Sequence, residues 1–263
     1  MDTHVIGGHA GDTGCRRPQQ GGGCPYHAQK NALKPWRQKP WVIPPPAHAA
    51  WVCAREDVLE VYTRPDEPQR PQVCIDETST PLVAETRRPI PAAPGPPERV
   101  DDAYERQGPA HLCMVFEPWA GPRRVQVTAR RTAVDCAQLI RAVGDEQYPQ
   151  AENIVRVMDH LHTHQPASWY EAFPPAAARR LLERVAIHDT PKPGRGVEMA
   201  ETELSVLASQ CLNRRRPDPS LLRREVAAWE RQRHAAACRV DWRFTTQDAS
   251  IKLKRLYPSI QPG

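Results

Sequence analysis

Residues 153–164 read Asn-Ile-Val-Arg-Val-Met-Asp-His-Leu-His-Thr-His, and this stretch decides the fold that the sequence favours. Ile154, Val155 and Val157 are β-branched, and prolines at 149 and 166 bracket the run, which predicts a buried central strand. That strand ends at Asp159, at the position where open α/β sheets place their active-site crevice. The structural alternative is an aspartate that only caps a turn.

Two further acids extend the functional interpretation. Asp76 closes a second short apolar run, residues 72–76, and Glu201 opens a helical pattern over residues 198–205. Two strand-end aspartates and a helix glutamate offer the oxygen ligands that hard divalent cations prefer. Two such ions roughly 3.5–4 Å apart can activate an attacking oxygen and stabilise the leaving oxygen of a phosphoryl displacement. The spacing allows the three acids to meet and leaves open whether they do.

The residues around these acids carry a resemblance. Residues 74–77 (Cys-Ile-Asp-Glu), 157–164 and 199–205 (Met-Ala-Glu-Thr-Glu-Leu-Ser) resemble the three blocks of a DDE transposase. The similarity is to bacterial insertion-sequence transposases of the Tc/mariner superfamily, specifically the insertion sequence 630 family. Residues 85–91, 170–173 and 240–246 also resemble that family, so that the likeness spans roughly residues 31–260.

The resemblance implies an α/β protein with an RNase H-like fold, in which a mixed five-stranded sheet is flanked by helices. The order of apolar runs along the chain agrees with such a core. The strands that we expect to share this sheet are Val73–Asp76, His111–Phe116, Val125–Thr128, Ile154–Asp159 and Ala186–His188.

The same resemblance implies a function. Asp76, Asp159 and Glu201 would be the catalytic residues, and would bind two Mg²⁺ or Mn²⁺ ions for DNA strand cleavage and strand transfer of an insertion sequence. The partners would be double-stranded DNA, at the element ends and the target, and a second copy in a homodimer. One alternative is a catalytically silent transposase remnant that binds DNA or a partner transposase without cutting. Another is a structural zinc protein.

Three alternating histidines follow the second aspartate. If the strand persisted, His160, His162 and His164 would lie on one face and would resemble a zinc cluster. The family shows a histidine at the position matching His164 but asparagines at those matching His160 and His162. We therefore expect His160 and His164 to lie behind the metal ligands or in a loop.

Other acids near the motifs receive different interpretations. The family has Trp-Leu-Asn where this chain has Gly196-Val197-Glu198, so Glu198 adds a carboxylate close to Glu201. Such a neighbour can raise a nearby pKa or compete for the metal. Strand alternation and helix phase predict that Glu77 and Glu203 point away from the site.

The chain divides into three segments by composition. Residues 1–30 are rich in glycine and lack periodicity, so we expect disorder, and a chain truncated or degraded where the family has a helix-turn-helix region. Residues 31–70 form a basic, proline-rich linker and a short helix, in which Lys34, Arg37 and Lys39 are candidate DNA phosphate contacts. A solvated linker is the alternative. Residues 71–260 form the catalytic domain.

Composition bounds the remaining expectations. The chain has 263 residues, a net charge of +5 and basic residues that are mostly arginine, which suits a polyanionic partner. No apolar run approaches the roughly 18 residues of a membrane span, so we expect no membrane partner and a cytoplasmic protein. The family resemblance implies that it is bacterial and nucleoid-associated. The prolines in residues 81–109 argue against a central strand there. Thr132 and Ser168 each begin a capping-box pattern.

Overall fold

The computed structural model describes residues 49–159, 165–191 and 197–258. Five strands and seven α-helices alternate along this part of the chain. They are α2 (Ala49–Thr63), β1 (Gln72–Glu85), β2 (Tyr104–Phe116), β3 (Arg123–Thr128), α3 (Ala133–Ala142), β4 (Ile154–Asp159), α4 (Ala167–Ala172), α5 (Pro175–Arg184), β5 (Val185–Thr190), α6 (Met199–Gln210), α7 (Pro219–Ala235) and α8 (Thr246–Lys252). A π-helical turn, Val143–Gln147, extends α3, and a 3-10 turn, Lys254–Leu256, follows α8.

The five strands form one mixed sheet in the order β3-β2-β1-β4-β5. β1, β2 and β3 are antiparallel neighbours, whereas β4 runs parallel to both β1 and β5. Residues 86–103 connect β1 to β2 and residues 117–122 connect β2 to β3, whereas helices occupy the two parallel crossovers. The predicted mixed five-stranded sheet is confirmed, and all five predicted strands belong to it.

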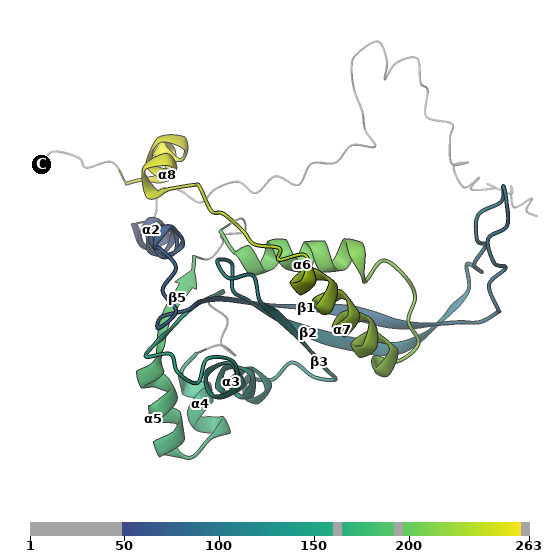
Figure 1. Ribbon diagram of the computed structural model, residues 1–263, viewed down its shortest axis with the longest axis horizontal. Helices are drawn as coiled ribbons and strands as arrows, with labels where there is room; N and C mark the ends of the chain where they lie inside the picture. Colours follow the sequence, from purple (N-terminus) through teal and green to yellow (C-terminus); the bar gives the residue numbers. More distant parts are fainter. Residues whose placement is uncertain (1–48, 160–164, 192–196, 259–263) are drawn as a thin grey trace, which may run out of the picture. The chain divides into compact units, whose positions relative to one another are not determined.

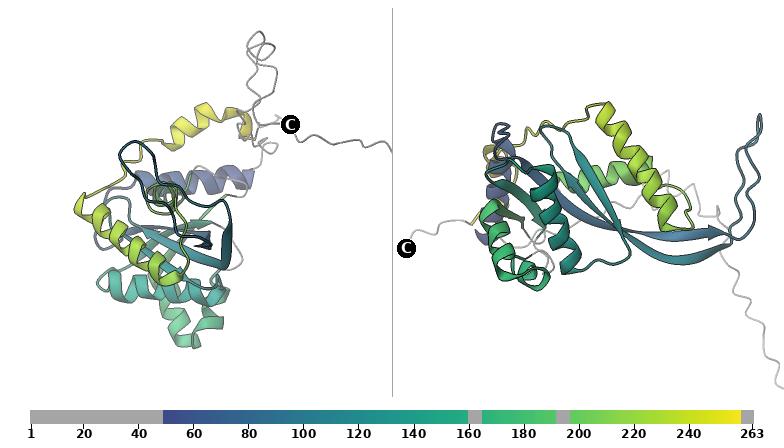
Figure 2. Two further views of the ribbon diagram at one scale, coloured as in Figure 1. Left: turned by 90° about the vertical axis from the view of Figure 1, so that its right-hand side faces the viewer. Right: turned by 60° about the horizontal axis from the view of Figure 1, so that its bottom comes forward.

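Helices cover both faces of the sheet (Figures 1 and 2). Strand alternation sends Val73 and Ile75 of β1 to the face covered by α3, α4 and α5, where they pack with Trp169 and Leu181. Cys74 points to the opposite face, which α2, α6 and α7 cover. The residues that fill this second face from the helices include Leu59, Tyr62, Met199, Leu204, Leu207, Val226 and Trp229.

Both β1 and β2 run further than predicted, into the proline-rich segment 81–109. Beyond the reach of β3 and β4 they pair only with each other, and they form a two-stranded arm in which Pro81 lies opposite Pro109 (Figure 1). Proline is excluded from central strands because it lacks a ladder donor, but a strand with one free edge tolerates it. The prolines therefore exclude a central position and still permit a strand.

The connection between α6 and α7 holds the base of this arm. The backbone N–H of Val83 donates to the carbonyl oxygen of Arg216 at 2.6 Å. Arg215 lies 2.8 Å from the Glu85 carboxylate and stacks over the Tyr104 ring, 5.4 Å from its centre. The arm is thus fixed to the helical layer that also carries Glu201.

Two helix starts test the capping boxes predicted from the sequence. The Thr132 and Asp135 capping box at the start of α3 is confirmed, with both reciprocal hydrogen bonds present. The Ser168 capping box is wrong, because α4 begins at Ala167 and the Ser168 hydroxyl donates to the Gln165 carbonyl at 2.7 Å. Among the described residues, no helix is both long and apolar enough to cross a membrane.

Candidate active site

The register of β1 and β4 brings two aspartates together. The parallel pairing ends with Ile75 opposite Met158, so Asp76 and Asp159 occupy the next position on the two strands. Alternation places both on the face of the sheet that α6 covers, because the residues two positions earlier, Cys74 and Val157, pack on that face. The two carboxylates therefore share one face at one level of the sheet.

One part of the sequence interpretation needs correction. Asp159 is the last residue of β4, as predicted, but Asp76 does not end a strand, because β1 continues to Glu85. The pairing of β1 with β4, by contrast, ends at Ile75, directly before Asp76. Beyond the two aspartates, β1 continues into the arm without β4 beside it.

The third acid comes from α6. Met199, Ala200 and Leu204 bury one side of this helix against the sheet face that carries the aspartates. Glu201 lies in the first turn, where its carboxylate is near the positive end of the helix dipole. We call Asp76, Asp159 and Glu201 the acid triad.

The electrostatics of Asp76 show that the members of the acid triad interact. Burial raises the pKa of Asp76 to about 6, and the charges of Asp159 and Glu201 raise it as well. The Glu77 backbone N–H donates to Asp76 Oδ1 at 2.7 Å and opposes these effects. The carboxylates of Asp159 on β4 and Glu201 on α6 thus act on that of Asp76 on β1.

The acid triad suits hard divalent cations by its chemistry. Within the described ranges, no three acidic, histidine or cysteine side chains are gathered so that they hold an ion as they stand. Like charges repel one another in the absence of a cation. The donor set consists of carboxylate oxygens. A fourth carboxyl, that of the buried Glu198, also interacts with the charges of the acid triad. Such a donor set fits Mg²⁺ or Mn²⁺ and does not resemble a closed zinc site.

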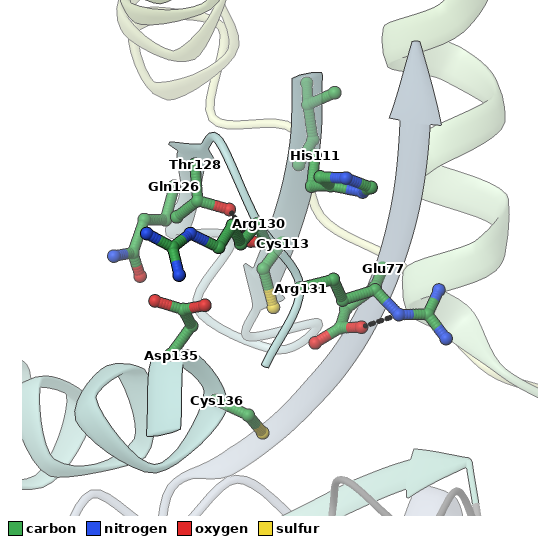
Figure 3. Close-up of a pocket in the computed structure, with 10 residues that line it drawn as sticks. Glu77, His111, Cys113, Gln126, Thr128, Arg130, Arg131, Asp135 and Cys136 are labelled. Atoms are coloured by element: carbon green, nitrogen blue, oxygen red, sulfur yellow. Dashed lines mark hydrogen bonds and ion pairs between the residues drawn. The ribbon is translucent and has the colours of Figure 1, made fainter. Parts of the chain in front are cut away.

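Glu77 and Glu203 point elsewhere. Glu77 pairs with Arg131 at 2.9 Å in a pocket on the opposite side of β1 and β2, beside His111 and Cys136 (Figure 3). Glu203 lies 2.8 Å from Arg123 and accepts hydrogen bonds from Arg233 at 3.0 and 3.1 Å. Both acids have structural partners away from the acid triad.

Several predicted site residues lie outside the described part of the chain. His160 and His164, the expected neighbours of the metal ligands, are among them, as are the candidate DNA contacts Lys34, Arg37 and Lys39. These assignments remain predictions.

Sequence reasoning missed a buried polar contact below the acid triad. The Tyr62 hydroxyl, fully buried on α2, accepts a hydrogen bond from the Met199 N–H at 3.4 Å, and Cys74 Sγ lies 3.7 Å from it. The Tyr62 ring also packs against Trp242, with centroids 5.0 Å apart. Tyr62 thus joins α2, β1 and the first residue of α6. A tyrosine in an otherwise apolar helical pattern was the only available signal.

The part of the sequence that forms the sheet and carries the acid triad also shows to which protein family the chain belongs. Residues 71–222 match the model of the DDE superfamily endonuclease, which is more than half of the chain. The chain belongs to the DDE superfamily of endonucleases. The matched range contains all five strands of the sheet and every member of the acid triad. No curated protein matches the chain.

One solved structure supports the fold. The chain is similar to the Mos1 transposase paired-end complex with left transposon end, at 15% identity and a TM-score of 0.51, over 88% of this chain and 69% of that chain. The Mos1 mariner paired-end complex with Mn is similar at 15% identity and a TM-score of 0.48, over 88% of this chain and 67% of that chain. The predicted RNase H-like fold of this DDE endonuclease is confirmed.

Glu198 gives the DDE endonuclease a pH-dependent stability. Burial, followed by repulsion from the acid triad, raises the pKa of Glu198 to about 9, well above its ordinary value of 4.5. Between these values the folded chain keeps a proton that the unfolded chain releases, so the free energy of unfolding of the metal-free protein should fall as pH rises.

Glu198→Gln should remove the Glu198 part of this dependence and leave the smaller part that comes from Asp76. We expect the variant to gain at least about 1 kcal/mol over wild type between pH 5 and pH 9, measured by urea unfolding in EDTA. Glu171→Gln, an exposed change on α4, is the matched control and should leave the pH profile unchanged. Parallel profiles for wild type and Glu198→Gln would contradict the burial of an unpaired carboxyl at this position.

Proposed function

We propose that this DDE endonuclease is a transposase of the insertion sequence 630 type, which cuts and joins DNA. The observation that carries the proposal is the convergence of the acid triad on one face of an RNase H-like sheet, where its members raise the pKa of Asp76. The motif resemblance in residues 74–77, 157–164 and 199–205 supports the assignment to this type.

The residues of the chain have separate tasks in this proposal. Asp76 and Asp159, fixed by the sheet register, and Glu201, fixed by α6, would hold two Mg²⁺ or Mn²⁺ ions. When bound, such ions supply positive charge for the attacking and leaving oxygens of a phosphoryl displacement. The Glu77 N–H orients the Asp76 carboxylate by its bond to Oδ1 and leaves the second oxygen for a ligand.

The proposed reaction has two steps. Water first attacks a phosphodiester at the end of the element, which breaks the phosphorus–oxygen bond and releases a 3′-hydroxyl. That hydroxyl then attacks a target phosphodiester, so that one phosphorus–oxygen bond forms as another breaks. The substrate is therefore double-stranded DNA in both steps. The Mos1 structure of similar fold is a complex with a transposon end, which supports this choice of substrate.

The remaining assignments complete the proposal. Residues 31–70 would act as a basic linker and helix before the catalytic domain, with Lys34, Arg37 and Lys39 on DNA phosphates, and His160 and His164 would lie behind the metal ligands. A homodimer would align two element ends for joint cleavage. A bacterial DNA substrate would place the protein with the nucleoid.

A nicking assay tests the proposed function. Purified full-length chain is incubated with a supercoiled plasmid that carries the element ends, in Mg²⁺, in Mn²⁺ and in EDTA. We expect nicking in either metal and none in EDTA. Metal-independent nicking, or none under any condition, would contradict the proposal and favour a silent remnant.

DNA binding should depend strongly on salt. Lys254 and Arg255 are exposed beyond α8 and have no ion-pair partner among the described residues, so they can neutralise phosphates. Raising salt from 50 to 200 mM should weaken binding about tenfold for every two phosphates neutralised. Changing Lys254 and Arg255 to Gln should flatten the salt slope, whereas Arg179→Gln on α5 should not.

An electrophoretic shift assay measures both the salt slope and the sequence preference. We expect little preference for the element's terminal repeat over scrambled duplex, because phosphate contacts carry no base information. A preference of about 10³ or more would show that this chain reads bases.

A further inference from the structure

The side chain of Glu198 is buried at the start of α6 but does not cap the helix. It occupies the N-cap position of the helix with an extended backbone, φ −102° and ψ 115°, yet its side chain makes no capping hydrogen bond. The residue is only 9% exposed. Its Oε1 atom is fully buried and has no hydrogen-bond partner within the described part of the chain. The carboxyl is therefore held in the interior without an evident structural task.

Two other glutamates are equally buried, and both have partners. Glu117 accepts a hydrogen bond from the Tyr148 hydroxyl at 2.5 Å. Glu203 is surrounded by the guanidinium groups of Arg123 and Arg233. A buried carboxylate without such a partner costs several kcal/mol, so unpaired examples are rare in proteins. Glu198 is the exception among the buried glutamates of the described chain.

The neighbours of Glu198 are acids. Glu198 is the N-cap residue and Glu201 the third residue of α6, and side chains at these two positions lie close together at a helix N-terminus. The acid triad acts on Glu198, and each of its three carboxylates raises the pKa of Glu198 in addition to burial. Among the described residues, no cationic group opposes that shift. Four carboxyl groups therefore share one region at the end of β4.

On the basis of the proposed function, we propose that Glu198 is a fourth carboxylate ligand of the divalent cations that the acid triad holds. Two divalent cations carry four positive charges, and the acid triad supplies three negative charges. A fourth carboxylate balances the site, and the cations in turn supply the partner that buried Oε1 lacks. Oxygen ligands of this type are those that Mg²⁺ and Mn²⁺ prefer.

Calorimetric titration with MnCl₂ tests this assignment without measuring catalysis. The full-length chain is stripped with EDTA, desalted and compared with Glu198→Gln, Asp76→Asn and Glu171→Gln. Glutamine keeps the shape of Glu198 and removes its charge, so the fold should persist, and near-UV circular dichroism checks this. We expect Glu198→Gln to weaken Mn²⁺ binding at least about tenfold, the lower bound for groups that support a metal site. Glu171→Gln should bind like wild type.

The remaining outcomes separate the two proposals. If Asp76→Asn loses Mn²⁺ affinity while Glu198→Gln binds as tightly as wild type or more tightly, Glu198 only repels the site and this inference is wrong. If neither variant changes the affinity, the acid triad does not hold the ion, and the proposed function fails with the inference. Smaller thermal stabilisation of Glu198→Gln by MnCl₂ would support the assignment independently.

Discussion

Replacing Asp76 or Asp159 by asparagine should abolish metal-dependent DNA nicking and leave a folded protein. Asparagine keeps the side-chain shape, and its Oδ1 can still accept the Glu77 N–H that now bonds to Asp76 at 2.7 Å. The substitution removes the charge that a divalent cation requires. Metal ions contribute several kcal/mol to such displacements, so we expect a loss of at least about 10³-fold in cleavage rate.

The two aspartate variants should also separate catalysis from DNA affinity. Plasmid nicking in Mg²⁺ measures the first, and a shift assay in EDTA measures the second, in which both variants should match wild type. Glu171→Gln should retain full nicking, since α4 lies on the other face of the sheet. Equal residual nicking by wild type and both aspartate variants would identify a contaminating nuclease, and the chain would then be a silent remnant.

Removing Glu203 should produce the largest loss of stability. Its carboxylate, on a residue only 3% exposed, joins Arg123 of β3 and Arg233 of α7 to α6. Arg123 is buried as well and stacks over the Phe116 ring at 4.9 Å. Glu203→Ala leaves this guanidinium buried without its counter-charge. Breaking a buried pair in this way costs about 3–5 kcal/mol.

Urea unfolding followed by circular dichroism measures this loss at pH 7. Glu183→Ala is the matched control, because Glu183 pairs with Arg179 on an exposed turn of α5 and its removal should change stability little. Since α6 also carries Glu201, we expect Glu203→Ala to weaken Mn²⁺ binding, and Glu203→Gln to do so less. A Glu203→Ala variant as stable as Glu183→Ala would refute the anchoring role of Glu203.

The sequence predicted those features that depend on short-range pattern. The β-branched residues Ile154, Val155 and Val157 predicted β4, and strand alternation predicted that Glu77 points away from Asp76. The Thr132 capping box also depends only on residues three positions apart. Such local signals survive folding because no distant contact competes with them.

Features that depend on tertiary contacts were not predictable. The arm exists because β1 and β2 pair beyond their other neighbours, and neither strand's own sequence reveals where that pairing stops. The Ser168 pattern failed for a local reason, because α4 begins one residue earlier, after Pro166, and the serine hydroxyl donates to the Gln165 carbonyl. The contact of Tyr62 with α6 joins residues 137 positions apart in the chain.

The arm of β1 and β2 also bears on how the protein avoids unwanted association. A lone pair of strands presents two rows of unpaired backbone groups, and such rows recruit further strands from other molecules. Pro81 and Pro109 lie opposite each other and remove one donor from each strand, while the Val83 N–H is already bound to Arg216. Neither border of the ribbon is therefore a continuous template, and the arm can extend into solvent without seeding a fibre.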